Sequence, residues 1–232
     1  TGQGQVVSPL LANIYLHYVL DLWFENEVRP RLKGEAYQIR FADDFLLFFQ
    51  YREDAIRVQK VLTERFAKYG LTLHPEKTRL IEFGRPAVAK AAKSGGPKPA
   101  TFDFLGFTHI GARGRNGAFT IQLQTMRKRL KRSLHNITMW CRENRHAAVE
   151  HQQKVLNQKL RGHYQYYGRP TNYRSLKRYF RVVRSTWKKQ LNRRTNGSAL
   201  KWDQNEKFLS RHPLETPRIT QSRVSTRGAH SK

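Results

Sequence analysis

The sequence is poor in cysteine, in acidic residues and in long apolar runs. Cys141 is the single cysteine among 232 residues, which excludes an internal disulfide framework and a cysteine-rich zinc site. No run of about 18 apolar residues occurs, which argues against a membrane span, and the start lacks the pattern of a secretion signal. We therefore expect a soluble, intracellular, cytoplasmic protein.

The scarcity of acids leaves a large excess of positive charge in the second half of the chain. The sequence has 44 Lys and Arg against 17 Asp and Glu, a net charge of +27. Residues 1–110 carry +3 of this charge and residues 111–232 carry +24. A basic imbalance of this size indicates a polyanionic partner, so we expect the second half to bind nucleic acid.

Hydrophobic periodicity predicts an α+β fold in the first half, with antiparallel strands and covering helices. We expect helices over 9–24 and Glu53–Tyr69, the latter burying Ile56, Val61, Leu62 and Phe66. The predicted strands are Tyr37–Phe41, Phe45–Phe49, a short pair within Leu71–Phe83, Phe102–Ile110 and Ala118–Gln122. The segment 86–100, rich in Ala, Gly, Lys and Pro, is predicted to be a mobile basic loop.

Beyond residue 122 the period becomes helical. Three apolar stripes predict a small three-helix bundle, with a break at Gly168–Pro170 and Cys141 packed in the core. The stripes begin at Leu123, Leu156 and Leu176. After Arg194 we expect a basic tail that is partly disordered and anchored by Trp202 and Phe208.

Two adjacent carboxylates, Asp43 and Asp44, lie between the runs Tyr37–Phe41 and Phe45–Phe49. A β-hairpin with this pattern can hold both acids at its tip, beside a divalent metal ion. The simpler alternative is that Asp is common in turns for local hydrogen-bonding reasons. The surrounding motifs favour the metal site.

Four blocks occur in order: Thr1–Leu16, Phe41–Asp44, Gly70–Thr78 and Phe104–Phe107. Together they resemble the later palm motifs of reverse transcriptases encoded by group II introns, although Phe41 replaces the more usual Tyr. The resemblance implies a partial palm with a primer-grip hairpin at 1–121, a helical thumb or maturase domain at 122–194 and a basic tail at 195–232.

The resemblance also implies roles for particular residues. Asp43 and Asp44 would be catalytic and would bind Mg²⁺ in a two-metal site. Gln3, Gly4, Phe41 and Lys77 would line the substrate, with Lys77 near the triphosphate of the incoming dNTP. Phe104, Leu105 and Gly106 would form the primer grip. A surface lysine after a turn remains the alternative for Lys77.

The faces of the first and third predicted helices opposite their apolar stripes are basic. The residues concerned are Arg127, Lys128, Lys131, Arg132, Lys177, Arg178, Arg181, Arg184 and Lys188. Few acids are spaced to pair with them along the helices, so an external polyanion should neutralise them, although charged runs are often only solvated. The expected partners are an RNA template, an RNA/DNA duplex and intron RNA.

The implied activity is RNA-directed DNA polymerisation by metal-dependent nucleotidyl transfer. Enzymes of this kind use three carboxylates, and the first would precede Thr1, so the chain is expected to be a C-terminal portion that is inactive alone. The alternative is an RNA-binding maturase or splicing cofactor without polymerase activity. The sequence leaves the oligomeric state open.

Overall fold

The computed structural model describes residues 7–94, 99–114, 116–194, 208 and 210–221. The chain divides into two compact units, an N-terminal unit of residues 1–81 and a C-terminal unit of residues 82–232. The fold is α+β, with antiparallel sheets and covering helices, as predicted. Within the described residues, no helix combines the length and apolar character needed to cross a membrane.

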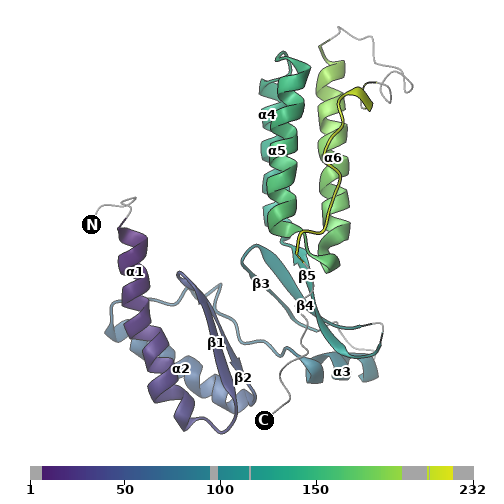
Figure 1. Ribbon diagram of the computed structural model, residues 1–232. Helices are drawn as coiled ribbons and strands as arrows, with labels where there is room; N and C mark the ends of the chain where they lie inside the picture. Colours follow the sequence, from purple (N-terminus) through teal and green to yellow (C-terminus); the bar gives the residue numbers. More distant parts are fainter. Residues whose placement is uncertain (1–6, 95–98, 115, 195–207, 209, 222–232) are drawn as a thin grey trace. The chain divides into compact units, whose positions relative to one another are not determined.

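The N-terminal unit begins with a long helical segment that leads into a β-hairpin (Figure 1). The segment comprises α1 (Ser8–Leu16), the π-helical turns η1 (His17–Asp21) and η2 (Phe24–Val28), and the short 3-10 helix η3 (Arg29–Arg31). It is longer than the predicted helix over 9–24. Val19, Leu20 and Phe24 are buried, whereas Leu10 and Ile14 of α1 are exposed, because the core of this unit meets the segment only from Val19 onward.

The hairpin consists of β1 (Ala36–Phe41) and β2 (Asp44–Phe49), with Tyr37 opposite Phe48 and Phe41 opposite Asp44. Both predicted strands are confirmed. Phe45, Leu47 and Phe49 pack against the core of the unit, while Tyr37, Ile39 and Phe41 alternate onto the other face. Those three side chains are exposed, so the hairpin has one packed face and one open face.

Helix α2 (Arg52–Lys68) covers the packed face of the hairpin. Its buried stripe is Ala55, Val58, Leu62 and Phe66. The prediction that Ile56 and Val61 face inward is wrong, since they are 50% and 42% exposed. The helix ends at Lys68, and Gly70 just beyond it supplies the predicted stop, with a φ of 67° in the left-handed conformation that glycine adopts without strain.

Two further predictions for this region are wrong. Leu71–Phe83 forms no strand pair. Leu71 and Leu73 instead pack on the core of the N-terminal unit. The alternating apolar residues are therefore explained by burial of one side of the segment and not by pairing with another strand. The predicted loop at 86–100 begins as a helix, α3 (Arg85–Ser94). Its alanines are the best helix formers, and Pro86 lies in the first turn, where proline is tolerated.

The C-terminal unit contains a three-stranded antiparallel sheet in the order β3 (Thr101–Phe104), β4 (Phe107–Arg113) and β5 (Phe119–Thr125). The predicted hairpin around Gly117 is confirmed between β4 and β5, and Gly117 has a φ of 76°. The single strand expected over Phe102–Ile110 is instead two strands, because the chain reverses at Leu105 and Gly106.

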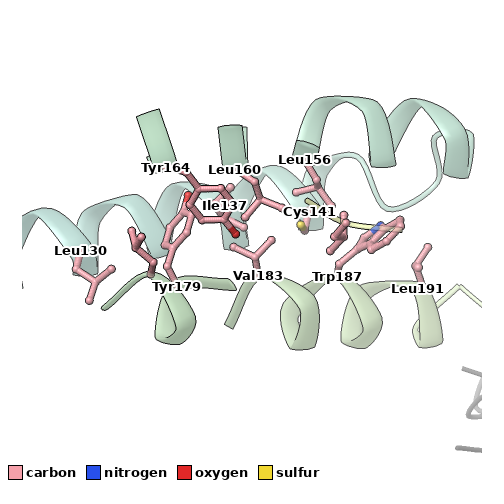
Figure 2. Close-up of a cluster of buried hydrophobic side chains, with 12 residues drawn as sticks. Leu130, Ile137, Cys141, Leu156, Leu160, Tyr164, Tyr179, Val183, Trp187 and Leu191 are labelled. Carbon is pink, nitrogen blue, oxygen red and sulfur yellow. The ribbon is translucent and has the colours of Figure 1, made fainter. Parts of the chain in front are cut away.

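Three helices complete this unit: α4 (Arg127–Glu143), α5 (Val149–Tyr167) and α6 (Tyr173–Asn192). The first helix of the bundle begins later than its predicted apolar stripe, since Leu123 belongs to β5. The short 3-10 helix η4 (Pro170–Asn172) separates α5 from α6 at the predicted break. Figure 2 shows Val183 and Trp187 of α6 among the side chains of the bundle core, with Cys141 of α4.

The last described segment packs along α5 and is not a free tail. Leu214 is buried in the bundle core, and Phe208 packs against Trp187, as predicted for an anchor. The hydroxyl of Tyr164 donates a hydrogen bond to the carbonyl of Glu215 (3.0 Å). The predicted anchor Trp202 lies outside the described residues, as does the end of the tail for which disorder is predicted.

Candidate active site

The turn between β1 and β2 presents the two adjacent carboxylates. Ala42 and Asp43 form the turn, with a φ of 55° at Ala42, and Asp44 is the first residue of β2. Both acids are exposed, and neither carboxylate has a hydrogen-bond or ion-pair partner among the described residues. Their oxygens are therefore not used to cap the turn, and they can bind a cation.

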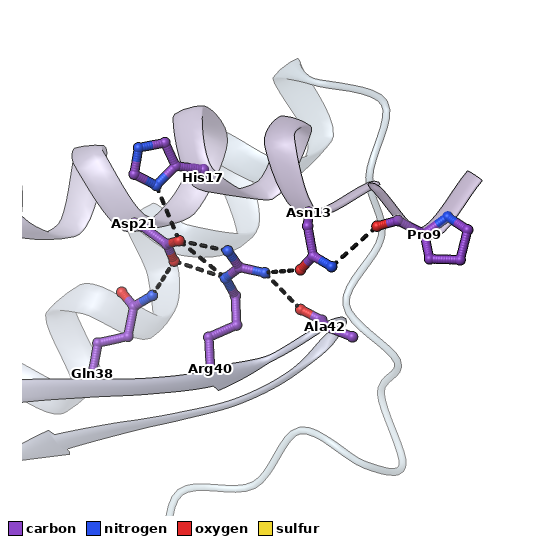
Figure 3. A network of polar contacts seen from close by, with 7 residues as sticks. All are labelled: Pro9, Asn13, His17, Asp21, Gln38, Arg40 and Ala42. Atoms are coloured by element: carbon purple, nitrogen blue, oxygen red, sulfur yellow. Dashed lines mark hydrogen bonds and ion pairs between the residues drawn. The ribbon is translucent and has the colours of Figure 1, made fainter. Parts of the chain in front are cut away.

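Arg40, next to the turn, ties the hairpin to the helical segment (Figure 3). Its Nη1 donates to the carbonyl of Ala42 (3.0 Å) and to Oδ1 of Asn13 (2.8 Å). Its Nε and Nη2 donate to the two carboxylate oxygens of Asp21, at 2.8 and 2.6 Å. These bonds fix the backbone immediately before Asp43.

Asp21 is the anion at the centre of this network. It also accepts hydrogen bonds from Gln38 and His17. Burial opposes its ionisation, but the hydrogen bonds and charge of Arg40 outweigh that effect, so the pKa of Asp21 lies below its ordinary value. The hydrogen bond from Arg40 to Asp21 in turn raises the pKa of the guanidinium. Asp21 is thus an ionised partner of Arg40.

The sequence prediction missed Asn13, Asp21 and Arg40. One signal was available, because Gln38 and Arg40 alternate with Tyr37, Ile39 and Phe41, and the packed side of the strand is therefore partly polar. Polar groups on a packed face need partners. The identity of those partners depended on how the helix crosses the hairpin.

The other predicted substrate residues are only partly described. Phe41 lies on the open face of the hairpin with 63% of its surface exposed. Lys77 is exposed in a turn in which its backbone N–H and that of Thr78 donate to the carbonyl of His74, at 3.1 and 2.9 Å. Gln3 and Gly4 lie outside the described residues.

The predicted primer grip forms the β3–β4 turn of the C-terminal unit. Phe104 pairs with Phe107 across a two-residue turn made by Leu105 and Gly106, which have φ values of 47° and 78°. Two positive φ values are typical of the tight turns that match the twist of a hairpin. Gly106 and Phe107 are buried, so the turn is held against its own unit.

Residues 1–109 match the family model described as reverse transcriptase (RNA-dependent DNA polymerase). This part of the chain is therefore similar to reverse transcriptases. The match includes the carboxylate turn, Lys77 and the β3–β4 turn, whereas helices α4 to α6 lie outside it. A comparison with curated proteins found no match.

The bundle that follows the reverse transcriptase match has the predicted basic surfaces. Exposed cations lie on α4 and α6, and none of the following has an ion-pair partner among the described residues: Arg127, Lys128, Lys131, Arg132, Lys177, Arg178 and Arg181. Arg184 and Lys188 of α6 are half-buried. Helix α6 contains no acid, and Glu143 is the one acid of α4.

The oxygens of Asp43 and Asp44 suit a hard cation such as Mg²⁺, which is bound in proteins by one or two carboxylates together with water and substrate phosphates. Among the described residues, no three His, Cys, Asp or Glu side chains gather as a metal-binding group. Asp21 is already paired with Arg40. The described donor set is therefore the carboxylate pair alone.

Proposed function

We propose that residues 1–109 are a reverse transcriptase domain and that, with the basic bundle, they form part of a group II intron-type RNA-directed DNA polymerase. The observation that carries this proposal is the pair of exposed carboxylates, which have no partner among the described residues, on a turn that Arg40 holds in place, within a reverse transcriptase match. Asp43 and Asp44 would hold Mg²⁺ at the 3′ end of a primer. Bound Mg²⁺ would activate the 3′ hydroxyl and neutralise charge on the phosphate.

The remaining groups would bind and orient the substrates. The ammonium of Lys77 would neutralise the triphosphate of the incoming dNTP, and the ring of Phe41 would support the base pair from the open face of the hairpin. The turn at Leu105 and Gly106 would support the primer strand by shape. Enzymes of this kind use three carboxylates and the described residues bring together only two, so we expect no polymerase activity from the 232 residues alone.

Primer extension tests the carboxylate pair in a protein that joins this chain to the upstream part of a reverse transcriptase. Asp43→Asn removes one negative charge and keeps the shape of the side chain. Because metal-assisted charge neutralisation contributes several kcal/mol to the transition state, we expect a loss of at least about 100-fold in rate. Glu64→Gln, an exposed acid on α2, is the matched control and should retain the rate.

The same variants separate the polymerase from the alternative function. Asp43→Asn should leave binding of an RNA/DNA duplex unchanged, because the carboxylate adds no attraction for phosphate. Loss of binding together with synthesis would mean that Asp43 is structural. Full synthesis by Asp43→Asn would remove the polymerase role, and the basic bundle would then favour an RNA-binding maturase without catalysis.

The basic surface is tested by the salt dependence of binding. Arg181→Glu on α6 should weaken binding of the 232-residue chain to an RNA/DNA duplex and reduce the slope of log K against log salt by about one. Lys154→Glu, an exposed site on α5, changes the net charge equally and is the control. An equal effect of both substitutions would mean that only total charge matters and that α6 is not the contact.

A further inference from the structure

The β3–β4 turn is held by the end of α5 through one specific hydrogen bond. The hydroxyl of Tyr166 donates to the carbonyl of Leu105 at 2.8 Å, across 61 positions of sequence. Leu105 is the first residue of the turn and has a positive φ of 47°, which is uncommon for a residue other than glycine. The hydrogen bond therefore holds a peptide in a conformation that leucine does not favour.

Aromatic packing reinforces this contact. The ring of Phe107, directly after the turn, stacks on Tyr166 with a centroid distance of 5.9 Å and an interplanar angle of 12°. Tyr167 meets the same ring edge-on at 5.2 Å. Phe107 is 8% exposed, so these two tyrosines of α5 help to bury the residue that follows the turn.

The fit around Gly106 is also close. A Cβ atom at this position would lie 3.0 Å from the hydroxyl of Tyr167. The carbonyl of Gly106 accepts a hydrogen bond from the backbone N–H of Met126 at 3.0 Å, immediately before α4. The turn is thus bound by the residues that begin α4 and those that end α5.

Tyr166 nevertheless remains 51% exposed. A tyrosine that only filled the core would be buried. The ring of Tyr166 is accessible instead, and its hydroxyl donates a hydrogen bond to the backbone of the turn. We propose that Tyr166 is a positioning residue for the β3–β4 turn. It fixes the turn to the helical bundle, so that the two bind nucleic acid together. This inference rests on the proposed function, in which the turn supports the primer strand and the bundle binds the duplex.

The consequence is a preference for primer ends. If Tyr166 positions the turn, the 232-residue chain should bind an RNA/DNA duplex with a recessed 3′ end more tightly than a blunt duplex of the same length. Tyr166→Phe keeps the ring on Phe107 and removes only the hydrogen bond to Leu105. In this variant we expect the ratio of the two affinities, recessed end to blunt end, to fall about three- to tenfold, which is the effect of one hydrogen bond. Its affinity for the blunt duplex should be unchanged.

Fluorescence anisotropy with both duplexes measures the preference, and hydrogen exchange of peptides that span 104–107 measures the turn directly. Tyr166→Phe should accelerate exchange in those peptides. Tyr173→Phe is the matched control, because the hydroxyl of this exposed tyrosine on α6 has no hydrogen-bond partner among the described residues. A purely structural role would shift the urea midpoint and leave the preference for the recessed end intact.

Each outcome separates the inference from the proposed function. An unchanged preference and unchanged exchange in Tyr166→Phe would overturn the positioning role while the proposed function stands. If the unsubstituted chain bound neither duplex, the proposed nucleic-acid function would fail, and exchange at 104–107 would still decide whether Tyr166 holds the turn. Faster exchange together with a reduced preference would establish the inference.

Discussion

Folding of the C-terminal unit should weaken in acid because of one buried imidazole. His163 of α5 is 8% exposed and stacks on the ring of Tyr179 at 3.7 Å, and its buried Nε2 has no hydrogen-bond partner in the part of the chain that the structure describes. The other rings that contact it belong to Tyr164 and Tyr167. Burial lowers the pKa of His163 from its ordinary 6.5 to about 4.

The sign and size of the effect follow from this pKa difference. Above pH 6.5 the imidazole is neutral in both the folded and the unfolded chain, so it contributes nothing to pH dependence. Between pH 6.5 and about 4 only the unfolded chain takes up the proton, and the free energy of unfolding therefore falls as the pH falls. The loss should reach about 3 kcal/mol at pH 4, at about 1.4 kcal/mol for each pH unit.

His163→Phe tests this reasoning because it keeps a planar ring against Tyr179 and removes the titratable nitrogen. Hydrogen exchange of α5 peptides over a urea series, at pH 7.5 and pH 4.5, reports on this unit alone. The difference in stability between the two pH values should be smaller in the variant than in the parent by about 2 to 3 kcal/mol. His109 also has a pKa lowered by burial, but its contribution is common to both proteins and cancels.

The control is His151→Phe, at an exposed histidine on the same helix. This variant should retain the acid sensitivity of the parent. The reasoning is refuted if His163→Phe and the parent lose equal stability between the two pH values, or if the His151 variant loses the pH dependence as well.

Three further perturbations follow from the structure. Arg40→Lys keeps the charge but cannot bind Asp21 through two nitrogens. The free energy of unfolding of the N-terminal unit, measured in urea, should fall by about 1 to 3 kcal/mol. An unchanged urea midpoint would contradict the network. Gly106→Ala should cost the C-terminal unit about 1 kcal/mol or more, also in urea, because φ is 78° and the new methyl group would crowd Tyr167. Cys141 should resist a thiol reagent at pH 8 until urea is added, because burial raises its pKa to about 11, and rapid native labelling would disprove its burial.

Much of the fold follows from local sequence pattern. The alternation around Asp43 and Asp44 predicted both strands of the hairpin, and steps of three and four predicted the helical bundle, because backbone period depends mainly on neighbouring residues. Gly70 and Gly117 were placed correctly because a positive φ is a local requirement. The burial of Cys141 followed from its place on an apolar stripe.

Other predictions failed where tertiary packing makes the choice. In α2 the chain buries Ala55 and Val58 in place of Ile56 and Val61. The core of the N-terminal unit packs against one face of the helix, and Ile56 and Val61 do not lie on that face. The pattern of Leu71 and Leu73 came from contact with the core and not from strand pairing. Side-chain hydrophobicity indicates that a residue can be buried, but the direction of the helix relative to its neighbours decides which residues are.

The contacts that position the candidate site were set by tertiary structure alone. The sequence by itself determined two acids at a hairpin turn and a strongly basic second half. It did not determine that Arg40 would join the turn to Asp21, 19 positions away, or that Tyr166 would hold Leu105 across 61 positions. Hydrogen bonds between such distant residues depend on the three-dimensional arrangement of helices and strands. The hydrophobic periodicity of the sequence does not specify that arrangement.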